Sequence, residues 1–152
     1  MTVGPRLLNK VALVTGGASG IGAATAPAFA EHGAAVVVTD VNEDQGGAVA
    51  ENICQSGGQA IYLQLDTADE AQWTCAVVET LAKFSQIDIL ANIAGVSDRH
   101  PDNKSDRRIE DASLESWERV FAVNAAGVFL GVKHVIAPMR AGGGGSIINI
   151  SS

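Results

Sequence analysis

Short apolar runs alternate with segments of helical periodicity along almost the whole chain. We expect buried strands where such a run is apolar throughout, at 11–14, 35–39, 60–65, 87–92 and 146–151. Helices are predicted between them, at 20–32, from 42 to the glycine pair at 57–58, from 67 to about 84 and from 113 to about 140. Strands separated by helices favour a parallel sheet covered on both faces. The pattern therefore predicts a doubly wound α/β fold with strand order 3-2-1-4-5.

Several helix ends carry recognisable signals. Asn42 is followed three residues later by Gln45, and Thr67 is followed by Glu70 at the same spacing, which is the arrangement of a capping box. We therefore expect Asn42 and Thr67 to cap the second and third helices. Gly33 suits a left-handed C-terminal cap of the first helix.

Composition indicates one compact soluble domain spanning residues 1–152. Hydrophobic residues make up 47% of the chain and charged residues 18%. A net charge of −7 argues against nucleic acid or an anionic membrane surface as a partner, since both require clustered cations. No uninterrupted apolar run approaches the roughly 18 residues of a membrane span, and the N-terminus lacks the order of a secretory signal. By default we expect a cytoplasmic protein that does not span a membrane.

Cysteine and histidine usage suggests no metal or redox chemistry. Cys54 and Cys75 lie far apart in helical segments, so we expect packed thiols rather than a disulfide. His32, His100 and His134 are isolated from partners at metal-ligand spacing. No metal site is predicted.

The segment 15–22, Thr-Gly-Gly-Ala-Ser-Gly-Ile-Gly, directly joins the first strand to the first helix. Its glycines fall at Gly16, Gly20 and Gly22, with the spacing G-x-x-x-G-x-G. Backbone N–H groups at a helix start, unobstructed by side chains, can approach a diphosphate and meet it with the positive end of the helix dipole. The segment therefore favours a nucleotide-binding turn, with a plain flexible turn as the alternative.

Asp40 ends the second strand, where a carboxylate can accept hydrogen bonds from adenosine ribose hydroxyls. The same carboxylate would repel a 2′-phosphate, and no Lys or Arg stands within 15–22 or at 41–42 to reverse that preference. We therefore predict NAD rather than its phosphorylated form. The alternative is that Asp40 serves only as a carboxylate near a helix N-terminus that satisfies free N–H groups.

These residues, with four later segments, resemble the short-chain dehydrogenase/reductase family. Asp66 is similar to the acid that contacts adenine, the segment 92–95 to the Asn-Asn-Ala-Gly segment, Asn124 to the helix asparagine, and 145–152 to the strand that delivers the catalytic serine. Together with the turn and Asp40, the resemblance implies cofactor contacts at Thr15, Gly16, Ser19, Gly20, Ile21, Gly22, Asp40, Asp66, Asn92, Ala94 and Gly95. It implies catalytic roles for Ser152, which would position the substrate oxygen, and Asn124, which would hold a proton-relay water.

Two departures from the family pattern stand out. Ile93 replaces the second asparagine of the Asn-Asn-Ala-Gly segment. The family's Tyr-x-x-x-Lys motif, which carries proton transfer, follows its serine, whereas the given sequence stops at Ser152 and its one tyrosine is Tyr62. We therefore expect the N-terminal portion of an NAD-dependent alcohol dehydrogenase or ketone reductase, without the family's last two strands and inactive by itself.

Further expectations follow from the resemblance. The full-length protein is expected to be a homo-oligomer that acts on a small alcohol or ketone, and the fifth strand should expose Ile147, Ile148 and Ile150 at an edge. A non-catalytic module that binds NAD or dimerises remains the alternative. A metabolite-sensing regulator on the same fold would need a further segment that residues 1–152 do not contain.

Overall fold

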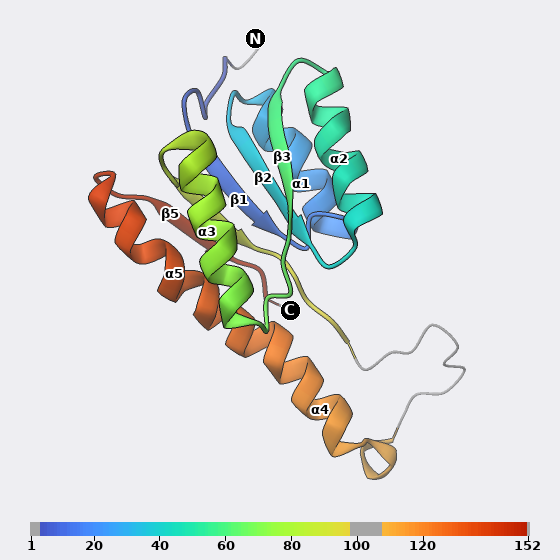
Figure 1. The fold of residues 1–152 in the computed structure, drawn as a ribbon. Helices are drawn as coiled ribbons and strands as arrows, with labels where there is room; N and C mark the ends of the chain where they lie inside the picture. Colours follow the sequence, from blue (N-terminus) through green and yellow to red (C-terminus); the bar gives the residue numbers. More distant parts are fainter. Residues whose placement is uncertain (1–3, 98–107, 152) are drawn as a thin grey trace.

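A computed structural model describes residues 4–97 and 108–151 of the chain. The described strands form one parallel sheet in the order β3-β2-β1-β4-β5, which confirms the predicted topology (Figure 1). The strands are β1 Val11–Thr15, β2 Ala35–Asp40, β3 Gln59–Gln64, β4 Ile89–Asn92 and β5 Ser146–Asn149. The helices are α1 Gly20–Glu31, α2 Glu43–Gln55, α3 Glu70–Phe84, α4 Leu114–Phe121 and α5 Gly127–Ala141, with a short 3-10 turn at Ile109–Asp111.

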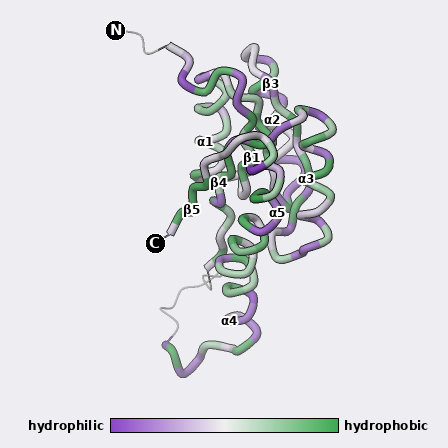
Figure 2. The backbone as a smooth tube through the Cα atoms, turned by 90° about the vertical axis from the view of Figure 1, so that its left-hand side faces the viewer, coloured by the Kyte–Doolittle hydropathy of each residue, from purple (hydrophilic) through white to green (hydrophobic). Residues whose placement is uncertain are grey.

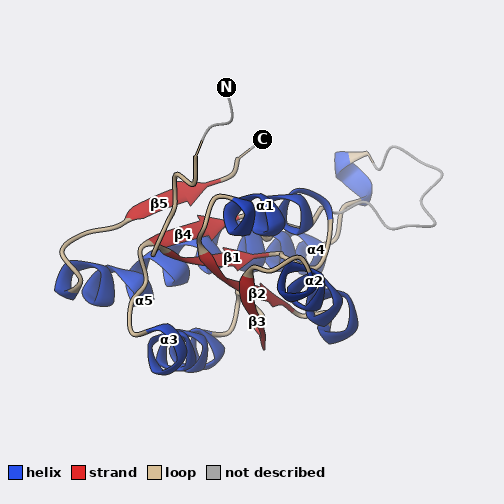
Figure 3. Ribbon diagram, turned by 90° about the horizontal axis from the view of Figure 1, so that it is seen from above, coloured by secondary structure: helices blue, strands red, loops and turns tan. Residues whose placement is uncertain are grey.

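Helices cover both faces of the sheet. Figure 3 shows α1 and α2 on one side and α3 and α5 on the other. Side chains of β1 alternate between the two layers: Leu13 packs with Trp73 under α3 and α5, whereas Ala12 and Val14 pack with Ala26 under α1. Every residue of β1 and β4 is buried. The central strands are therefore dry on both faces, as their uninterrupted apolar sequence predicts.

The helix caps follow the prediction at α2 and depart from it at α3. The side chain of Asn42 accepts a hydrogen bond from the Gln45 N–H, which confirms that cap. The prediction of Thr67 as the cap of α3 is wrong, because Asp69 holds that position and accepts from the N–H groups at the start of the helix. The residues before Asp69 form a separate turn, in which Asp66 accepts from the Ala68 N–H.

The long helix predicted from 113 to about 140 is three consecutive segments. A π-helical turn, Ala122–Ala126, separates α4 from α5. No residue of α4 is buried, and Figure 2 shows α4 projecting from the layered body. On its exposed side the rings of Trp117 and Phe121 stack with centroids 4.1 Å apart. Periodicity alone did not reveal the π turn, because the apolar spacing continues through it.

The stretch Leu114–Ala141 also departs from the expectation about apolar runs. By length and composition alone it is apolar enough to cross a membrane, with a window of mean hydropathy 1.7 that is 22% buried. In the structure, α5 packs on the sheet and on α3 through Leu130, Val135 and Met139. Part of the apolar character of this stretch is therefore that of a core helix.

The expectation that the cysteines are packed thiols is wrong, because both Cys54 and Cys75 are exposed. Each cysteine is next to buried residues of its helix in the sequence. Ile53 is buried directly before Cys54, and Trp73 and Ala76 are buried before and after Cys75. Each cysteine therefore lies beside the buried stripe of its helix rather than in it, and the Cys54 thiol donates to the Ala60 carbonyl of β3 at 3.4 Å.

Asp88 ties together the amino ends of β1 and β4. Its carboxylate accepts from the Val11 N–H at 2.8 Å, from Lys10 Nζ at 3.1 Å and from Gln86 Nε2 at 2.7 Å. Burial raises the pKa of Asp88, but these three hydrogen bonds outweigh burial and hold the pKa below its ordinary value. The ionised carboxylate therefore stabilises the folded state.

We predict that Asp88→Asn lowers the free energy of unfolding by about 1–3 kcal/mol at pH 7, because hydrogen bonds to a charged acceptor are lost. Since the folded pKa is depressed, the contribution is present above the unfolded pKa of about 3.9 and is lost as the pH falls through the folded pKa. Urea unfolding from pH 7 to pH 3 checks this, with the exposed Glu79→Gln as the control. A deficit of Asp88→Asn that stayed constant to pH 3 would contradict it.

Candidate active site at the carboxyl ends of the strands

A cleft of about 520 Å³ lies where β1, β2 and β4 end. Its volume is in the range of small-molecule and cofactor sites. Nine of the predicted cofactor residues line it: Gly16, Ser19, Gly20, Ile21, Gly22, Asp40, Asp66, Ala94 and Gly95. The cleft thus lies at the carboxyl ends of the strands, next to the point between β1 and β4 where the strand order reverses direction. Ligands of doubly wound sheets bind at this point.

The glycine turn requires glycine at two close approaches. A Cβ at Gly16 would lie 2.8 Å from the Ala94 Cα, and Gly16 also has φ +66°. A Cβ at Gly22 would lie 2.0 Å from the carbonyl oxygen of Gly16. Both distances are far below the van der Waals contact distance, so a side chain at either position would force the turn to move.

The N-terminus of α1 opens onto the cleft without a side-chain cap. Ser19 is its N-cap residue and makes no capping hydrogen bond, whereas Asn42, Asp69 and Ser113 all cap their helices within the described residues. The first turn of α1 contains no acidic residue either. The free N–H groups and the positive end of the helix dipole are therefore left for an anion, such as a diphosphate.

Asp40 faces this helix start from the end of β2. One carboxylate oxygen accepts from the Ala18 N–H at 3.0 Å and the other from the Asn42 N–H at 3.0 Å. The carboxylate thus braces the glycine turn while it lines the cleft. The alternative of a carboxylate that satisfies backbone N–H groups therefore describes part of what Asp40 does, and each oxygen retains lone pairs for a ligand hydroxyl.

Thr15 and Asn92 lie behind the cleft wall, where both are buried. The Thr15 hydroxyl oxygen accepts from the N–H groups of Ile93 at 3.0 Å and Ala94 at 3.1 Å. The Asn92 side chain donates to Asn149 of β5. Thr15 therefore holds the segment after β4 in place, and Asn92 joins the end of β4 to β5. Ile93, where the family has asparagine, contributes its backbone N–H to this arrangement and packs its side chain against the core below α1.

Asn124 lies in the π-helical turn, and its amide is paired with a single residue. Its oxygen accepts from the Val96 N–H and its nitrogen donates to the Val96 carbonyl, both at 2.8 Å. One helical turn earlier, Arg119 donates to the Ser97 carbonyl at 3.1 Å and also lines the cleft. Asn124 and Arg119 together fasten the chain after β4 to the helix. Ser152 lies outside the described residues.

Tyr62 lies near the cleft but is held in a neutral state. Its hydroxyl donates to the Asp40 carbonyl at 2.8 Å. Burial raises the pKa of Tyr62, and the charges of Asp40 and Glu43 raise it further. The tyrosine therefore stays protonated at neutral pH and supplies no base.

Seven further residues line the cleft without having been predicted as cofactor contacts: Val41, Leu65, Thr67, Ile93, Val96, Arg119 and Val123. Most of them adjoin a predicted residue. Arg119 and Val123 could have been found from helical spacing, since they lie four residues apart and Val123 precedes Asn124. Among residues 4–97 and 108–151, no group of three His, Cys, Asp or Glu side chains is placed to hold a metal ion.

Comparisons with known proteins identify a family and its fold. The family model described as "short chain dehydrogenase" matches residues 10–152. The chain is 44% identical to 2,5-dichloro-2,5-cyclohexadiene-1,4-diol dehydrogenase of Sphingobium indicum and 41% identical to cyclopentanol dehydrogenase of Comamonas testosteroni, over 97% of its own length in both cases. It spans 56% of the length of each of these relatives.

A solved structure shows the same fold. A gluconate 5-dehydrogenase from Burkholderia cenocepacia, in complex with NADP and tartrate, matches 97% of this chain and 55% of its own with a TM-score of 0.85 and 37% identity.

We predict that Gly22→Ala lowers the free energy of unfolding by about 2 kcal/mol or more, because its Cβ would overlap the Gly16 carbonyl. Gly47→Ala is the matched control: it lies within α2 with nothing within 4 Å, and alanine should raise stability by about 0.5–1 kcal/mol. Urea unfolding of both variants decides the point. Equal effects of the two substitutions would show that Gly22 is not a close approach.

Proposed function

The chain belongs to the short-chain dehydrogenase family, and from that premise we propose that the protein is an NAD-dependent oxidoreductase that transfers hydride between a secondary alcohol and its ketone. The observation that carries the proposal is the uncapped start of α1 beside the carboxylate of Asp40, both on one cleft of cofactor size. An anion site next to a hydroxyl-binding carboxylate is complementary to a dinucleotide.

The cleft residues divide the work of holding NAD. The glycine turn and the start of α1 bind the diphosphate, Asp40 binds the adenosine ribose and Asp66 binds adenine. Ala94 and Gly95 complete the cofactor wall, which Thr15 and Asn92 support from behind. When bound, NAD supplies the acceptor or donor of a hydride.

The preference for NAD rests on Asp40. The related gluconate 5-dehydrogenase was solved with NADP, so the family fold accepts the phosphorylated cofactor. In this chain the carboxylate of Asp40 is fixed by two backbone N–H groups and cannot turn away without releasing them. A ribose 2′-phosphate would meet that fixed negative charge.

The catalytic groups proposed within residues 1–152 are Ser152 and Asn124. Ser152 would position the substrate oxygen, and Asn124 would contribute to proton relay, in addition to fastening Val96. Alcohol oxidation also needs a base for the hydroxyl proton. Tyr62 does not supply it, so we propose that residues 1–152 bind cofactor without turning over substrate.

The substrate class follows from the relatives. The two named above act on alcohols carried by six- and five-membered carbon rings, as their names state. We therefore propose a cyclic secondary alcohol or ketone as the substrate. We also propose that the reaction takes place in the cytoplasm.

Self-association of the complete protein is supported by α4, which exposes Leu114, Trp117 and Phe121. Such a run of large apolar side chains is typical of an interface between protein chains. The acidic balance of the sequence, with net charge −7, disfavours nucleic acid as a partner.

We predict that Asp40→Asn weakens NAD binding by roughly tenfold, since charge-assisted hydrogen bonds to the ribose are lost. Binding of NADP should stay unchanged or improve, because the repulsion of the 2′-phosphate is removed. Asparagine keeps one oxygen for the turn, so folding is preserved better than with alanine. Calorimetric titration with both cofactors measures the ratio, and equal losses for the two would contradict the assignment.

We predict that residues 1–152 bind NAD but reduce it at no more than the solvent rate with a panel of cyclic secondary alcohols. NADH absorbance measures the turnover, and robust turnover would refute the account of the missing base. Reading the coding sequence beyond Ser152 separates the two functions that remain open. Continuation through Tyr-x-x-x-Lys supports the oxidoreductase, and a stop codon supports a non-catalytic NAD-binding module.

A further inference from the structure

Two side chains from the first turn of α3 hold the backbone of the cleft wall from behind. The Gln72 Oε1 accepts from the Asp66 N–H at 2.8 Å. The Trp73 Nε1 donates to the Thr67 carbonyl at 2.9 Å. Asp66 and Thr67 both line the cleft. Both backbone groups are therefore paired with side chains that do not themselves touch the cleft.

Trp73 cannot swing away from this contact. Its side chain is fully buried in the core between the sheet, α3 and α5. Gly131 of α5 lies so close that a Cβ there would be 2.8 Å from the far edge of the indole. The N–H of the ring is thus aimed at Thr67 by packing as well as by the hydrogen bond.

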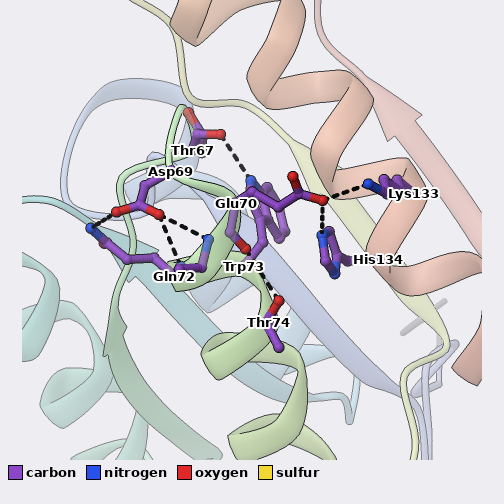
Figure 4. Close-up of polar contacts among 9 residues, drawn as sticks. Thr67, Asp69, Glu70, Gln72, Trp73, Thr74, Lys133 and His134 are labelled. Atoms are coloured by element: carbon purple, nitrogen blue, oxygen red, sulfur yellow. Dashed lines mark hydrogen bonds and ion pairs between the residues drawn. The ribbon is translucent and has the colours of Figure 1, made fainter.

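Gln72 is oriented by a second hydrogen bond. Its amide nitrogen donates to Asp69 at 3.0 Å (Figure 4), which leaves the amide oxygen to accept from the Asp66 N–H. Hydrogen bonds from the side chain and N–H of Gln72 and from the Ala71 N–H hold the pKa of Asp69 below its ordinary value. Asp69 is therefore a permanent acceptor at neutral pH, and the orientation of Gln72 does not depend on its protonation.

A third contact fixes the helix that carries both side chains. Glu70, the first residue of α3, pairs with Lys133 and His134 of α5 (Figure 4). The turn at 66–69 is thereby connected to the long helix on the same face of the sheet. The wall of the cleft is held by the core and not only by its own loop.

We propose that Gln72 and Trp73 are positioning residues that set the placement of Asp66 and Thr67 against the adenine ring, and so determine how strongly the site distinguishes adenine from other purines. The inference rests on the proposed function, since it concerns the adenine end of the NAD site. Asp66 would accept from the adenine amino group, and that contact depends on where the backbone of Asp66 is held.

The test compares NAD with nicotinamide hypoxanthine dinucleotide, in which a carbonyl replaces the adenine amino group. Calorimetric titration of the 152-residue chain should give roughly tenfold tighter binding of NAD, the value of one well-placed hydrogen bond. In Gln72→Met and Trp73→Phe this preference for NAD, the ratio of the two dissociation constants, should fall from roughly tenfold to roughly threefold or less. Gln55→Met and Trp117→Phe change residues that do not line the cleft and contact Glu51 and Phe121 instead, so they should keep the ratio of the unchanged protein.

The outcomes separate the inference from the proposed function. Failure of the unchanged protein to bind either dinucleotide refutes the proposed function and the inference with it. Two outcomes overturn the inference alone. The first is that the unchanged protein binds the two dinucleotides equally well. The second is that Gln72→Met and Trp73→Phe weaken binding of the two dinucleotides by the same factor, because a merely structural role lowers both affinities together. Gln72 is only partly buried, so Gln72→Met keeps the test decisive if Trp73→Phe does not fold.

Discussion

The shape of the cleft depends on the hydroxyl of Thr15, whose oxygen accepts hydrogen bonds from the N–H groups of both Ile93 and Ala94. Thr15 ends β1, and Ala94 follows β4, so this side chain closes the gap between two neighbouring strands just where they stop pairing. The closure brings Ala94 to within contact of Gly16. A larger residue at Gly16, or a looser segment after β4, would separate the two walls between which a dinucleotide would lie.

The cleft carries charges of both signs. The start of α1 provides a positive pole without any acidic residue in its first turn, and Asp40 and Asp66, at and after the ends of the neighbouring strands β2 and β3, provide acceptors in the same cleft. A dinucleotide carries a negative diphosphate and, on its adenosine half, hydrogen-bond donors, so these charges are complementary to it. Asp40 also holds the Ala18 N–H, and for this reason cofactor selection and the shape of the turn rest on one carboxylate.

Much of this arrangement could be predicted from the sequence, because apolar runs and glycine spacing report directly on buried strands and close approaches. The strand order and the Asn42 cap were predicted correctly. The cap of α3 was not, because Thr67 and Asp69 both suit a capping position and only the turn at Asp66 decides between them. The support of the wall by Gln72 and Trp73 was also hidden, since a hydrogen bond between a side chain and the backbone six residues earlier leaves no periodic signal. The exposure of Cys54 and Cys75 was missed too, because helical periodicity locates a buried stripe but does not decide whether a residue directly beside it is buried.

Amide NMR of the 152-residue chain during titration with NAD tests most directly whether this cleft is the dinucleotide site. The account predicts saturable shifts concentrated at the glycine turn 16–22, at the end of β2 around Asp40, at 66–67 and at 94–95. A second cavity of about 450 Å³ lies at the amino ends of β1, β2 and β3, lined by Lys10, Gly33 and Gly58 among others, and serves as an internal reference. Shifts clustered there, or no saturable shifts at the glycine turn, would contradict the account.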